Sequence, residues 1–315
     1  MAFNYTSTTH RTTYDAIAPT LPHLSASDKT VIIAGGSAGI GKATALAFLE
    51  AGSRRLALTG RRGELLLTAR SELASKYPDA KIITFAADVT DEAGVNHAFA
   101  TVKEELGPAN VIVNSAGVAP VKPLVDSDIN AWWATFGTNV KGAAIVAQAV
   151  DTHASPSATV LQLSTAGALF PAGPGFPISS YAASKLAVTK VMEYFGAENP
   201  GLKVITVHPG VVVDTPGGQK MVEDSGVPFQ GDDSKSFFRV SYAKCCLEAD
   251  VLALINSLVD LPAHFLVWAA SEESNFLKNK FVFATWDVEE LKARQDEIAN
   301  SLELIIGLNG VPRQI

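Results

Sequence analysis

The sequence predicts an α/β fold in which a mostly parallel, seven-stranded sheet is covered by helices on both faces. Short apolar runs rich in β-branched residues recur along the chain, and helical segments separate most of them. Such alternation is typical of a doubly wound sheet with right-handed crossovers. The expected strands are residues 29–34, 55–59, 81–86, 110–113, 158–163, 203–207 and 280–284.

Composition and charge exclude several other classes of protein. Of the 315 residues, 47% are hydrophobic and 18% are charged, which allows a large core and excludes global disorder. The formal net charge of −7 provides no general basic surface for nucleic acid or an anionic membrane. No uncharged apolar run reaches ~18 residues, so no membrane-spanning helix is expected.

The cysteines and histidines show no spacing typical of metal ligands. Cys245 and Cys246 are sequence neighbours, which make a poor disulfide and a poor metal site. We therefore expect two reduced cysteines, no metal and a cytoplasmic protein.

A single catalytic domain is expected over residues 29–290, because no linker interrupts the pattern. Residues 1–28 lack the apolar core of a secretory signal and are interpreted as an extension that either wraps the domain or is mobile. Residues 291–315 are expected to form a C-terminal helix and tail on the same domain, with helical spacing over residues 288–308. Residues 214–233 are rich in glycine and proline, which indicates a substrate lid or else an ordinary surface loop.

A glycine turn follows the first expected strand. Gly35, Gly39 and Gly41 lead directly into a helical segment. Without a Cβ, these residues let backbone N–H groups approach a pyrophosphate, which also gains from the positive end of the helix dipole. A glycine turn alone can be only a tight turn, but the flanking strand and helix favour a dinucleotide site.

The end of the second expected strand indicates which dinucleotide binds. Dinucleotide folds place an acid there for the ribose 2′-OH of NAD, or an arginine for the 2′-phosphate of NADP. Here Gly60 stands in the place of the acid and is followed by Arg61 and Arg62. Arg61 can pair with the phosphate, and Ser37 can donate a hydrogen bond to it. The alternative is that both arginines are solvated surface charges.

Tyr181 and Lys185 lie four residues apart, so a helix would place them on the same face. An ammonium beside a phenol favours the phenolate and lowers the pKa of the tyrosine, which gives a poised acid or base. Such pairs also occur by chance on exposed helices. The chemistry therefore depends on the other motifs.

Taken in order, these motifs resemble the short-chain dehydrogenase/reductase family, in its non-extended type and with an ending like that of fungal members. The resemblance runs from about residue 29 to about residue 270 and implies a Rossmann domain that prefers NADP(H), with NAD(H) as the alternative. Ala38 departs from the basic residue of many NADP-dependent members, which weakens that preference. The motifs are Gly35-x-x-x-Gly39-Ile40-Gly41, Asp88-Val89, Asn114-Ser115-Ala116-Gly117, Asn139, Ser164, Tyr181-x-x-x-Lys185 and Pro209-Gly210.

The resemblance also implies how these residues hold the cofactor. Asp88 and Val89 would contact the adenine. The floor of the site would be formed by Asn114, Ala116 and Gly117, and the nicotinamide would be bordered by Pro209, Gly210, Val212 and Thr215.

Four residues are implied to carry the chemistry. Tyr181 would donate a proton to the substrate oxygen, and Lys185 would lower the pKa of the tyrosine and hold the nicotinamide ribose. Ser164 would hydrogen-bond the substrate oxygen, and Asn139 would hold a water that relays protons to Lys185. Taken singly, Ser164 could instead only terminate a strand, and Asn139 could only stabilise a helix irregularity.

Two further segments bear on substrate and assembly. Residues 169–178 form a proline-rich connection in which Phe170, Phe176 and Ile178 are expected to present an apolar wall, unless they are core residues. Trp132 and Trp133 lie in an expected helix that the resemblance places at a subunit interface. A homodimer or homotetramer is therefore expected.

The function expected from the sequence is the NADPH-dependent reduction of a ketone or aldehyde. The substrate would be a small to medium apolar molecule, with secondary metabolism as the suggested context. One alternative is an NAD(P)-dependent secondary alcohol dehydrogenase. Another, of a different class, is a cofactor-bound scaffold for a cyclisation or isomerisation, or a nucleotide-sensing protein.

Overall fold

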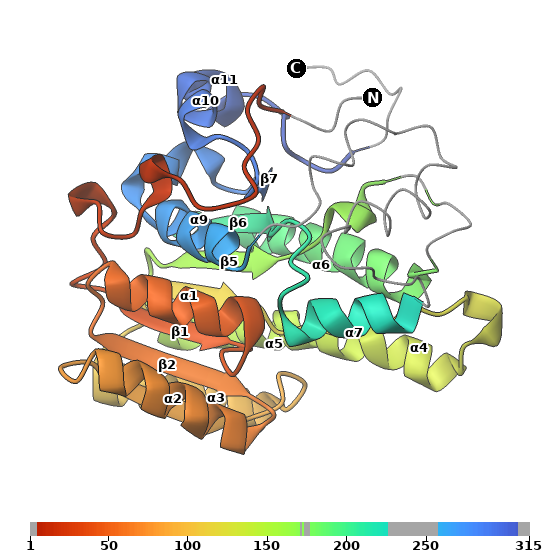
Figure 1. Ribbon diagram of the computed structural model, residues 1–315, viewed down its shortest axis with the longest axis horizontal. Helices are drawn as coiled ribbons and strands as arrows, with labels where there is room; N and C mark the ends of the chain where they lie inside the picture. The colour runs from red at the N-terminus through yellow and green to blue at the C-terminus, as the bar shows by residue number, and fades with distance from the viewer. Residues whose placement is uncertain (1–4, 171, 173–176, 226–257, 308–315) are drawn as a thin grey trace.

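The computed structural model describes residues 5–170, 172, 177–225 and 258–307 of the chain (Figure 1). Its centre is a seven-stranded sheet in which every neighbouring pair of strands is parallel, in the order β3-β2-β1-β4-β5-β6-β7. The predicted fold class is confirmed. The strands are β1 (Thr30–Ala34), β2 (Arg55–Gly60), β3 (Lys81–Ala86), β4 (Val111–Asn114), β5 (Thr159–Leu163), β6 (Lys203–His208) and β7 (Phe281–Phe283).

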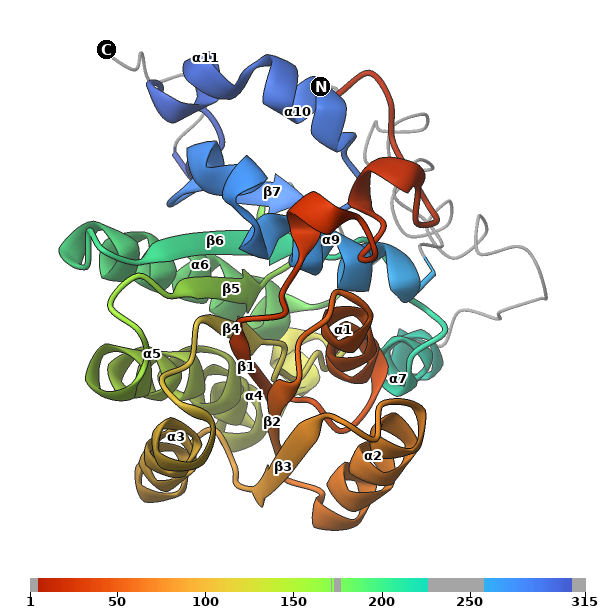
Figure 2. The same cartoon turned by 90° about the vertical axis from the view of Figure 1, so that its left-hand side faces the viewer.

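Helices cover both faces of the sheet, as Figure 2 shows. Residues from α1, α2 and α9 form one apolar core with the sheet, and residues from α3, α5 and α6 form a second core on the opposite face. The side chains of a strand alternate between these two faces, so a central strand is buried throughout. The helices are α1 (Gly39–Glu50), α2 (Gly63–Lys76), α3 (Glu92–Leu106), α4 (Ile129–Phe136), α5 (Gly142–His153), α6 (Ser179–Glu198) and α9 (Asp260–Ala270).

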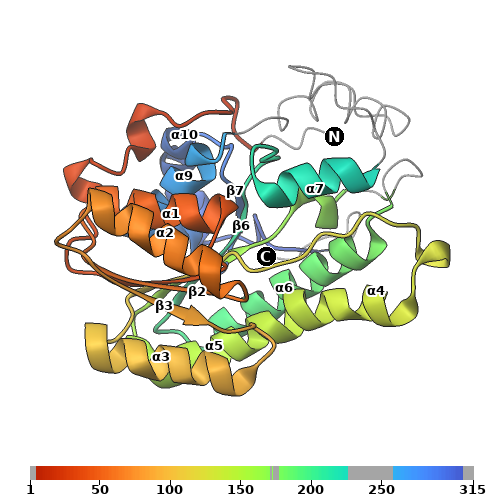
Figure 3. The same ribbon diagram turned by 60° about the horizontal axis from the view of Figure 1, so that its bottom comes forward.

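The strand order reverses between β1 and β4, which are neighbours in the sheet but not in the chain. In open α/β sheets a ligand binds outside the carboxyl ends of the strands at such a point. The loops after β1, β4 and β5 therefore converge where the sequence motifs lie. Figure 3 shows α4, α6 and α7 near this edge of the sheet.

Residues 214–233, which are expected to form a substrate lid or a surface loop, begin with a helix that lines the larger cavity described below. Residues Pro216–Ser225 form the helix α7, and residues 226–233 lie outside the described residues. Proline is tolerated in the first turn of a helix because its missing N–H would have no partner there. The Thr215 hydroxyl accepts a hydrogen bond from the Gly218 N–H at 3.1 Å, which caps the helix despite its glycines.

The expectation of one helix over residues 288–308 is wrong. The segment forms two short helices, α10 (Val288–Ala293) and α11 (Gln295–Ala299). Beyond them, Leu304 adopts a φ of 58°, which a continuing helix cannot accommodate. The Leu304 carbonyl accepts a hydrogen bond from the Phe281 N–H at 2.7 Å, so the chain turns back along β7.

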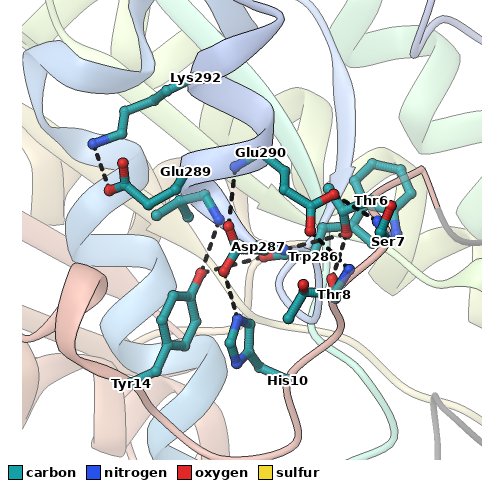
Figure 4. A network of polar contacts seen from close by, with 11 residues as sticks. Thr6, Ser7, Thr8, His10, Tyr14, Trp286, Asp287, Glu289, Glu290 and Lys292 are labelled. Atoms are coloured by element: carbon teal, nitrogen blue, oxygen red, sulfur yellow. Dashed lines mark hydrogen bonds and ion pairs between the residues drawn. The ribbon is translucent and has the colours of Figure 1, made fainter.

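Residues 5–14 lie against the start of α10, which joins an early segment of the chain to a late one (Figure 4). The backbone N–H groups of Ser7 and Thr8 donate to the Glu290 carboxylate at 2.6 and 2.8 Å. The His10 ring contacts the Asp287 carboxylate at 2.8 Å, and Asp287 also caps α10 by accepting from the Glu290 N–H. Burial disfavours the charge on Asp287, but these hydrogen bonds outweigh it and hold the pKa of Asp287 below its usual value.

We expect Asp287→Asn to lower the stability of the protein at neutral pH by about 1–3 kcal/mol, the usual range for a lost hydrogen bond to a charged group. Because the pKa of Asp287 is depressed in the fold, its contribution is present above the ordinary value of 3.8 and is lost as the pH falls through the folded value. Urea unfolding at several pH values measures this. The difference in unfolding free energy between Asp287→Asn and wild type should become smaller in acid. The control Asp296→Asn, which changes an exposed residue, should have the same unfolding free energy as wild type.

Candidate active site

Two connected hollows lie at the carboxyl edge of the sheet. The smaller, of about 270 Å³, is lined by the glycine turn after β1 and by the end of β2. The larger, of about 750 Å³, extends from it between α4 and α7 and over the start of α6. Both are lined by Ile40, Ser115, Gly117 and Thr215. This arrangement provides a nucleotide hollow that opens into a separate substrate cavity.

The glycine turn requires glycine for backbone reasons. Gly35 and Gly39 have φ values of 83° and 54°, in the left-handed region that favours glycine. A Cβ at Gly41 would lie 2.2 Å from the Gly35 carbonyl oxygen. The turn is fixed to β2, because the Thr59 carbonyl accepts from the Gly35 N–H at 2.8 Å. A cradle that a single Cβ would fill, at the amino end of a helix, fits a pyrophosphate.

Arg61 and Arg62 line the nucleotide hollow together with Ser37. Arg61 lies 3.8 Å from the Asp88 carboxylate, with 57% of its side chain exposed. Burial disfavours the charge on Asp88, but hydrogen bonds from Thr90 and the nearby Arg61 hold the pKa of Asp88 below its usual value. The arginines are therefore accessible, and the adjacent acid is already bound to neighbouring groups.

The floor of the site follows β4. The Asn114 side chain donates to the Gln162 side chain on β5 at 2.9 Å and accepts from the Ala116 N–H at 3.3 Å. A Cβ at Gly117 would lie 3.2 Å from the Asn139 oxygen and 3.3 Å from the Lys185 ammonium. Gly117 therefore allows these two polar groups to approach the loop. Val89, which is also buried, lines the nucleotide hollow.

Asn139 lies in a π-helical segment, Gly137–Lys141, between α4 and α5. Its side chain accepts from the Val118 N–H and donates to the Val118 carbonyl, both at 2.9 Å. It also donates to the Ser184 hydroxyl at 2.9 Å, which in turn donates to the Tyr181 carbonyl at 2.8 Å. A π-helical irregularity is frequent at functional sites. Here it connects Asn139 to the helix that carries Tyr181.

Tyr181 and Lys185 occupy consecutive turns of α6 and both line the substrate cavity. Lys185 is 4% exposed, and its ammonium donates to the Leu163 carbonyl at 2.9 Å. Burial lowers the pKa of Lys185 to about 8. Burial also raises the pKa of Tyr181, and a hydrogen bond with Thr165 opposes that rise only in part. The pKa of Tyr181 is therefore above its usual value in this arrangement, and the lowering of that pKa by Lys185 stays a prediction.

Two adjacent hydroxyl-bearing residues, Ser164 and Thr165, follow β5 and make different contacts. Ser164 lines the larger cavity, and its hydroxyl contacts the Thr189 hydroxyl and the Lys185 carbonyl, at 2.9 and 3.2 Å. Thr165 instead contacts the phenol of Tyr181 and accepts from the Gly167 N–H at 3.2 Å. Sequence reasoning missed Thr165. Strand alternation could have found it, since Ser164 continues the buried face of Gln162 and the next side chain faces the other way.

The far wall of the cavity follows β6. Pro209, Gly210, Val212 and Thr215 all line it, and Gly210 has a φ of 88°. His208 lines it too, and burial lowers the pKa of its ring to about 3, so the ring is neutral.

The apolar wall expected from residues 169–178 is described only in part. Phe170 and Ile178 line the cavity, whereas Phe176 lies outside the described residues, as do Cys245 and Cys246. Among the residues that the structure describes, no cluster of three or more histidine, cysteine or acidic side chains could hold a metal. In the same part of the chain, no helix is long and apolar enough to cross a membrane.

Comparison with known proteins identifies the family. Residues 29–226 match the family described as short chain dehydrogenase. The chain belongs to the short-chain dehydrogenase/reductase family. It is 33% identical over 313 residues to a short chain dehydrogenase/reductase of Claviceps purpurea, covering 96% of this chain and 94% of that protein. It is 31% identical over 315 residues to the short chain dehydrogenase/reductase AacuD of Aspergillus aculeatus, covering 96% of each.

Solved structures of the family share the fold. Levodione reductase superposes with a TM-score of 0.69 at 20% identity, covering 82% of this chain and 96% of that one. A short chain dehydrogenase from Burkholderia cenocepacia in complex with NADP gives 0.67 at 21% identity, covering 83% and 98%. Membership of this family makes the protein an NAD(P)-dependent oxidoreductase.

We expect Gly117→Ala to lower the turnover number by about 10- to 100-fold, because its Cβ would displace the Lys185 ammonium and the Asn139 amide. The fold should be retained, since both neighbours are side-chain ends that can shift. Circular dichroism and steady-state kinetics with an accepted carbonyl compound measure the two effects.

Gly63→Ala is the matched control, because a Cβ there would meet only the Ala86 Cβ at 3.5 Å. If the turnover number of Gly117→Ala equalled that of this control, the close approach at Gly117 would have no role in catalysis.

Proposed function

We propose that this enzyme uses NADPH to reduce the carbonyl group of a small to medium apolar ketone or aldehyde. The observation that carries the proposal is the Tyr181 phenol, which lines the larger cavity beside Thr165 and one turn from the buried Lys185. A carbonyl oxygen placed beside Tyr181 would meet a proton donor and a second hydroxyl. Secondary metabolism is the context we infer, and the cytoplasm is the inferred location.

The residues of the chain perform the remaining chemistry once the cofactor supplies the hydride to the carbonyl carbon. Thr165 and Tyr181 hydrogen-bond the substrate oxygen, which gains negative charge as the carbon is attacked. Because the Gly167 N–H occupies one lone pair of the Thr165 hydroxyl, this oxygen is fixed while its proton is free to be donated. Tyr181 then transfers its proton to the oxygen, and the product is an alcohol.

Lys185 and Asn139 support this proton transfer. The Lys185 ammonium has three donors, and the Leu163 carbonyl takes one of them, which leaves donors for the ribose hydroxyls of the cofactor. Asn139 holds the adjacent loop at Val118 and contacts α6 through Ser184. We propose that a water beside Asn139 relays protons to Lys185, so that Tyr181 can be reprotonated.

The preference for NADPH is supported by the end of β2. Gly60 leaves no carboxylate at the place where an acid would repel a 2′-phosphate, and Arg61 and Arg62 line the hollow there. Asp88 is the acid nearest to Arg61, but its charge is already compensated by Thr90 and Arg61. NADH is the alternative cofactor, and the binding of the two cofactors to Arg61→Ala distinguishes between them.

An apolar substrate is supported by the lining of the larger cavity. Val118, Ala134, Ile178, Val212 and Met221 line it, and Tyr181, Thr165 and Lys185 are among its polar lining residues. Apolar pockets with a few convergent polar groups are typical of small-molecule sites.

Two alternatives use the same site. Oxidation of a secondary alcohol is the reverse reaction and needs the same residues, so the ratio of cofactor forms decides between the two directions. A non-redox scaffold or a nucleotide sensor would not need Tyr181 as a proton donor. The Tyr181 phenol in the larger cavity, beside Thr165, favours a redox enzyme over a non-redox scaffold or a nucleotide sensor.

A homo-oligomer is also proposed, as a homodimer or homotetramer. Ile129 and Trp133 on α4 are 65% and 63% exposed, which is high for large apolar side chains. Trp132 instead donates to the Ser179 hydroxyl at 3.0 Å and joins α4 to the start of α6. One of the two tryptophans is therefore held within the subunit, and the other is available to a partner.

We expect Tyr181→Phe to lower the rate of carbonyl reduction by about 10²- to 10⁴-fold, because the phenylalanine cannot donate a proton. The measurement is loss of NADPH absorbance with a panel of aliphatic and aromatic carbonyl compounds. Thr165→Val should cost about 10²- to 10³-fold, and Thr165→Ser should retain most activity because it keeps the hydroxyl. Wild-type rates in Tyr181→Phe would contradict the proposed reaction.

Arg61→Ala tests the cofactor preference. Removing the guanidinium should weaken NADPH binding by about 10- to 100-fold, the range of a lost charge-assisted hydrogen bond, and should leave NADH binding nearly unchanged. Fluorescence titration gives both dissociation constants. Arg70→Ala serves as the control, because it removes an exposed arginine on α2 that does not line the nucleotide hollow. Equal losses for the two cofactors would contradict the assignment of Arg61 to the 2′-phosphate.

A further inference from the structure

Two buried hydroxyl groups meet at the backbone of the lysine on α6. Ser164 follows β5 and is 2% exposed, and Thr189 lies one turn beyond Lys185 and is 4% exposed. Their hydroxyl oxygens are 2.9 Å apart. Both are within hydrogen-bond distance of the Lys185 carbonyl oxygen, Ser164 at 3.2 Å and Thr189 at 2.8 Å.

Two consecutive residues at the end of β5, Leu163 and Ser164, contact the side chain and the backbone of Lys185. Its ammonium donates to the Leu163 carbonyl at 2.9 Å, and its own carbonyl faces the Ser164 hydroxyl. The Ser164 N–H is itself fixed to the Val207 carbonyl on β6 at 2.8 Å. The end of β5 therefore sets both the position of α6 and the height of the ammonium above the sheet.

The pair has little capacity left for a substrate. Each hydroxyl has one proton, and the partners that the described residues offer are one another and the Lys185 carbonyl. If the Ser164 hydroxyl turned toward the cavity, it would lose both of these contacts, and Thr189 alone would bond the Lys185 carbonyl. Thr165, the next residue, already contacts the Tyr181 phenol.

A threonine hydroxyl that bonds the carbonyl four residues earlier is common in helices and is by itself only local. What distinguishes this case is the Ser164 hydroxyl, which reaches the same carbonyl from another element. The resulting contact joins strand and helix at the one residue whose side chain must be held beside Tyr181. A displacement of about 1 Å at such a group can cost about 10²-fold in rate.

We propose that Ser164 and Thr189 are positioning residues for Lys185, and that Ser164 does not contact the substrate. The inference rests on the proposed function, in which Lys185 supports proton transfer by Tyr181. The hydroxyl pair holds the backbone of Lys185 against the end of β5, so that the ammonium and the phenol keep a fixed separation.

The test compares Ser164→Ala, Thr189→Val and Thr189→Ser in the full chain. Thr189→Val preserves the shape of the side chain and removes only the hydroxyl, whereas Thr189→Ser keeps the hydroxyl. Thr159→Val is the matched control, since Thr159 is a buried threonine at the amino end of β5, away from the site. Two readouts are used: kcat and KM for carbonyl reduction, and hydrogen exchange of peptides from α6 in the protein without added cofactor.

We expect Ser164→Ala and Thr189→Val each to lower kcat by about tenfold or more, with KM for the carbonyl substrate changed by less than about twofold. Thr189→Ser should restore most of the rate. Exchange should become faster in α6 around Lys185 and remain unchanged in α1 and α3. Thr159→Val should resemble wild type in both readouts.

Three results would overturn the proposal. A large rise in KM for Ser164→Ala with a silent Thr189→Val would make Ser164 a substrate contact. Faster exchange throughout the sheet, or failure of Thr189→Val to fold, would make the pair a general stability element. Wild-type kcat and exchange in both variants would give the pair no role. Full activity in Tyr181→Phe would contradict the proposed function instead, and the exchange result would still report on the pair.

Discussion

The burial of one lysine ammonium is the constraint on which the site depends. Removing a charge from water is costly unless it is bound by polar groups, and burial accordingly lowers the pKa of Lys185 from 10.5 to about 8. Because the unfolded chain holds this proton more tightly, burial opposes folding at neutral pH, and this penalty diminishes as the pH rises from about 8 toward 10.5. A group retained at such a cost is expected to have a function, and its surroundings explain how it is held.

Several separate elements converge on this ammonium. The end of β5 supplies the Leu163 carbonyl, and the loop after β4 supplies Gly117, which has no side chain to obstruct it. The π-helical segment brings Asn139 to Val118 and, through Ser184, to α6. Parallel strands end at the same edge of the sheet, so the fold itself brings these loops together. The site is therefore a consequence of strand order as much as of its individual residues.

The sequence predicted the sheet well, because β-branched runs separated by helical segments are a strong local signal. It also predicted the glycine turn, Asn139, Tyr181 and Lys185 at the edge where the structure brings them together. It did not predict the orientation of Ser164 or the contact of Thr165 with Tyr181, because a motif specifies residue types and not the face that a side chain takes at a strand end. The helix α7 was missed because Gly217 and Gly218 indicate a break, whereas Thr215 and Pro216 provide a sufficient helix start. The C-terminal turn at Leu304 depends on a backbone hydrogen bond with β7, which no local pattern reveals.

The most direct test of this account is an NMR titration of the Lys185 side chain, with its signal assigned by comparison with Lys185→Arg. The experiment needs neither substrate nor cofactor, so it measures the constraint imposed by the fold alone. The account predicts that Lys185 titrates near pH 8, far below an ordinary lysine. Titration at the ordinary value of 10.5 would contradict it, because the ammonium would then have to be solvated rather than enclosed between β5 and α6.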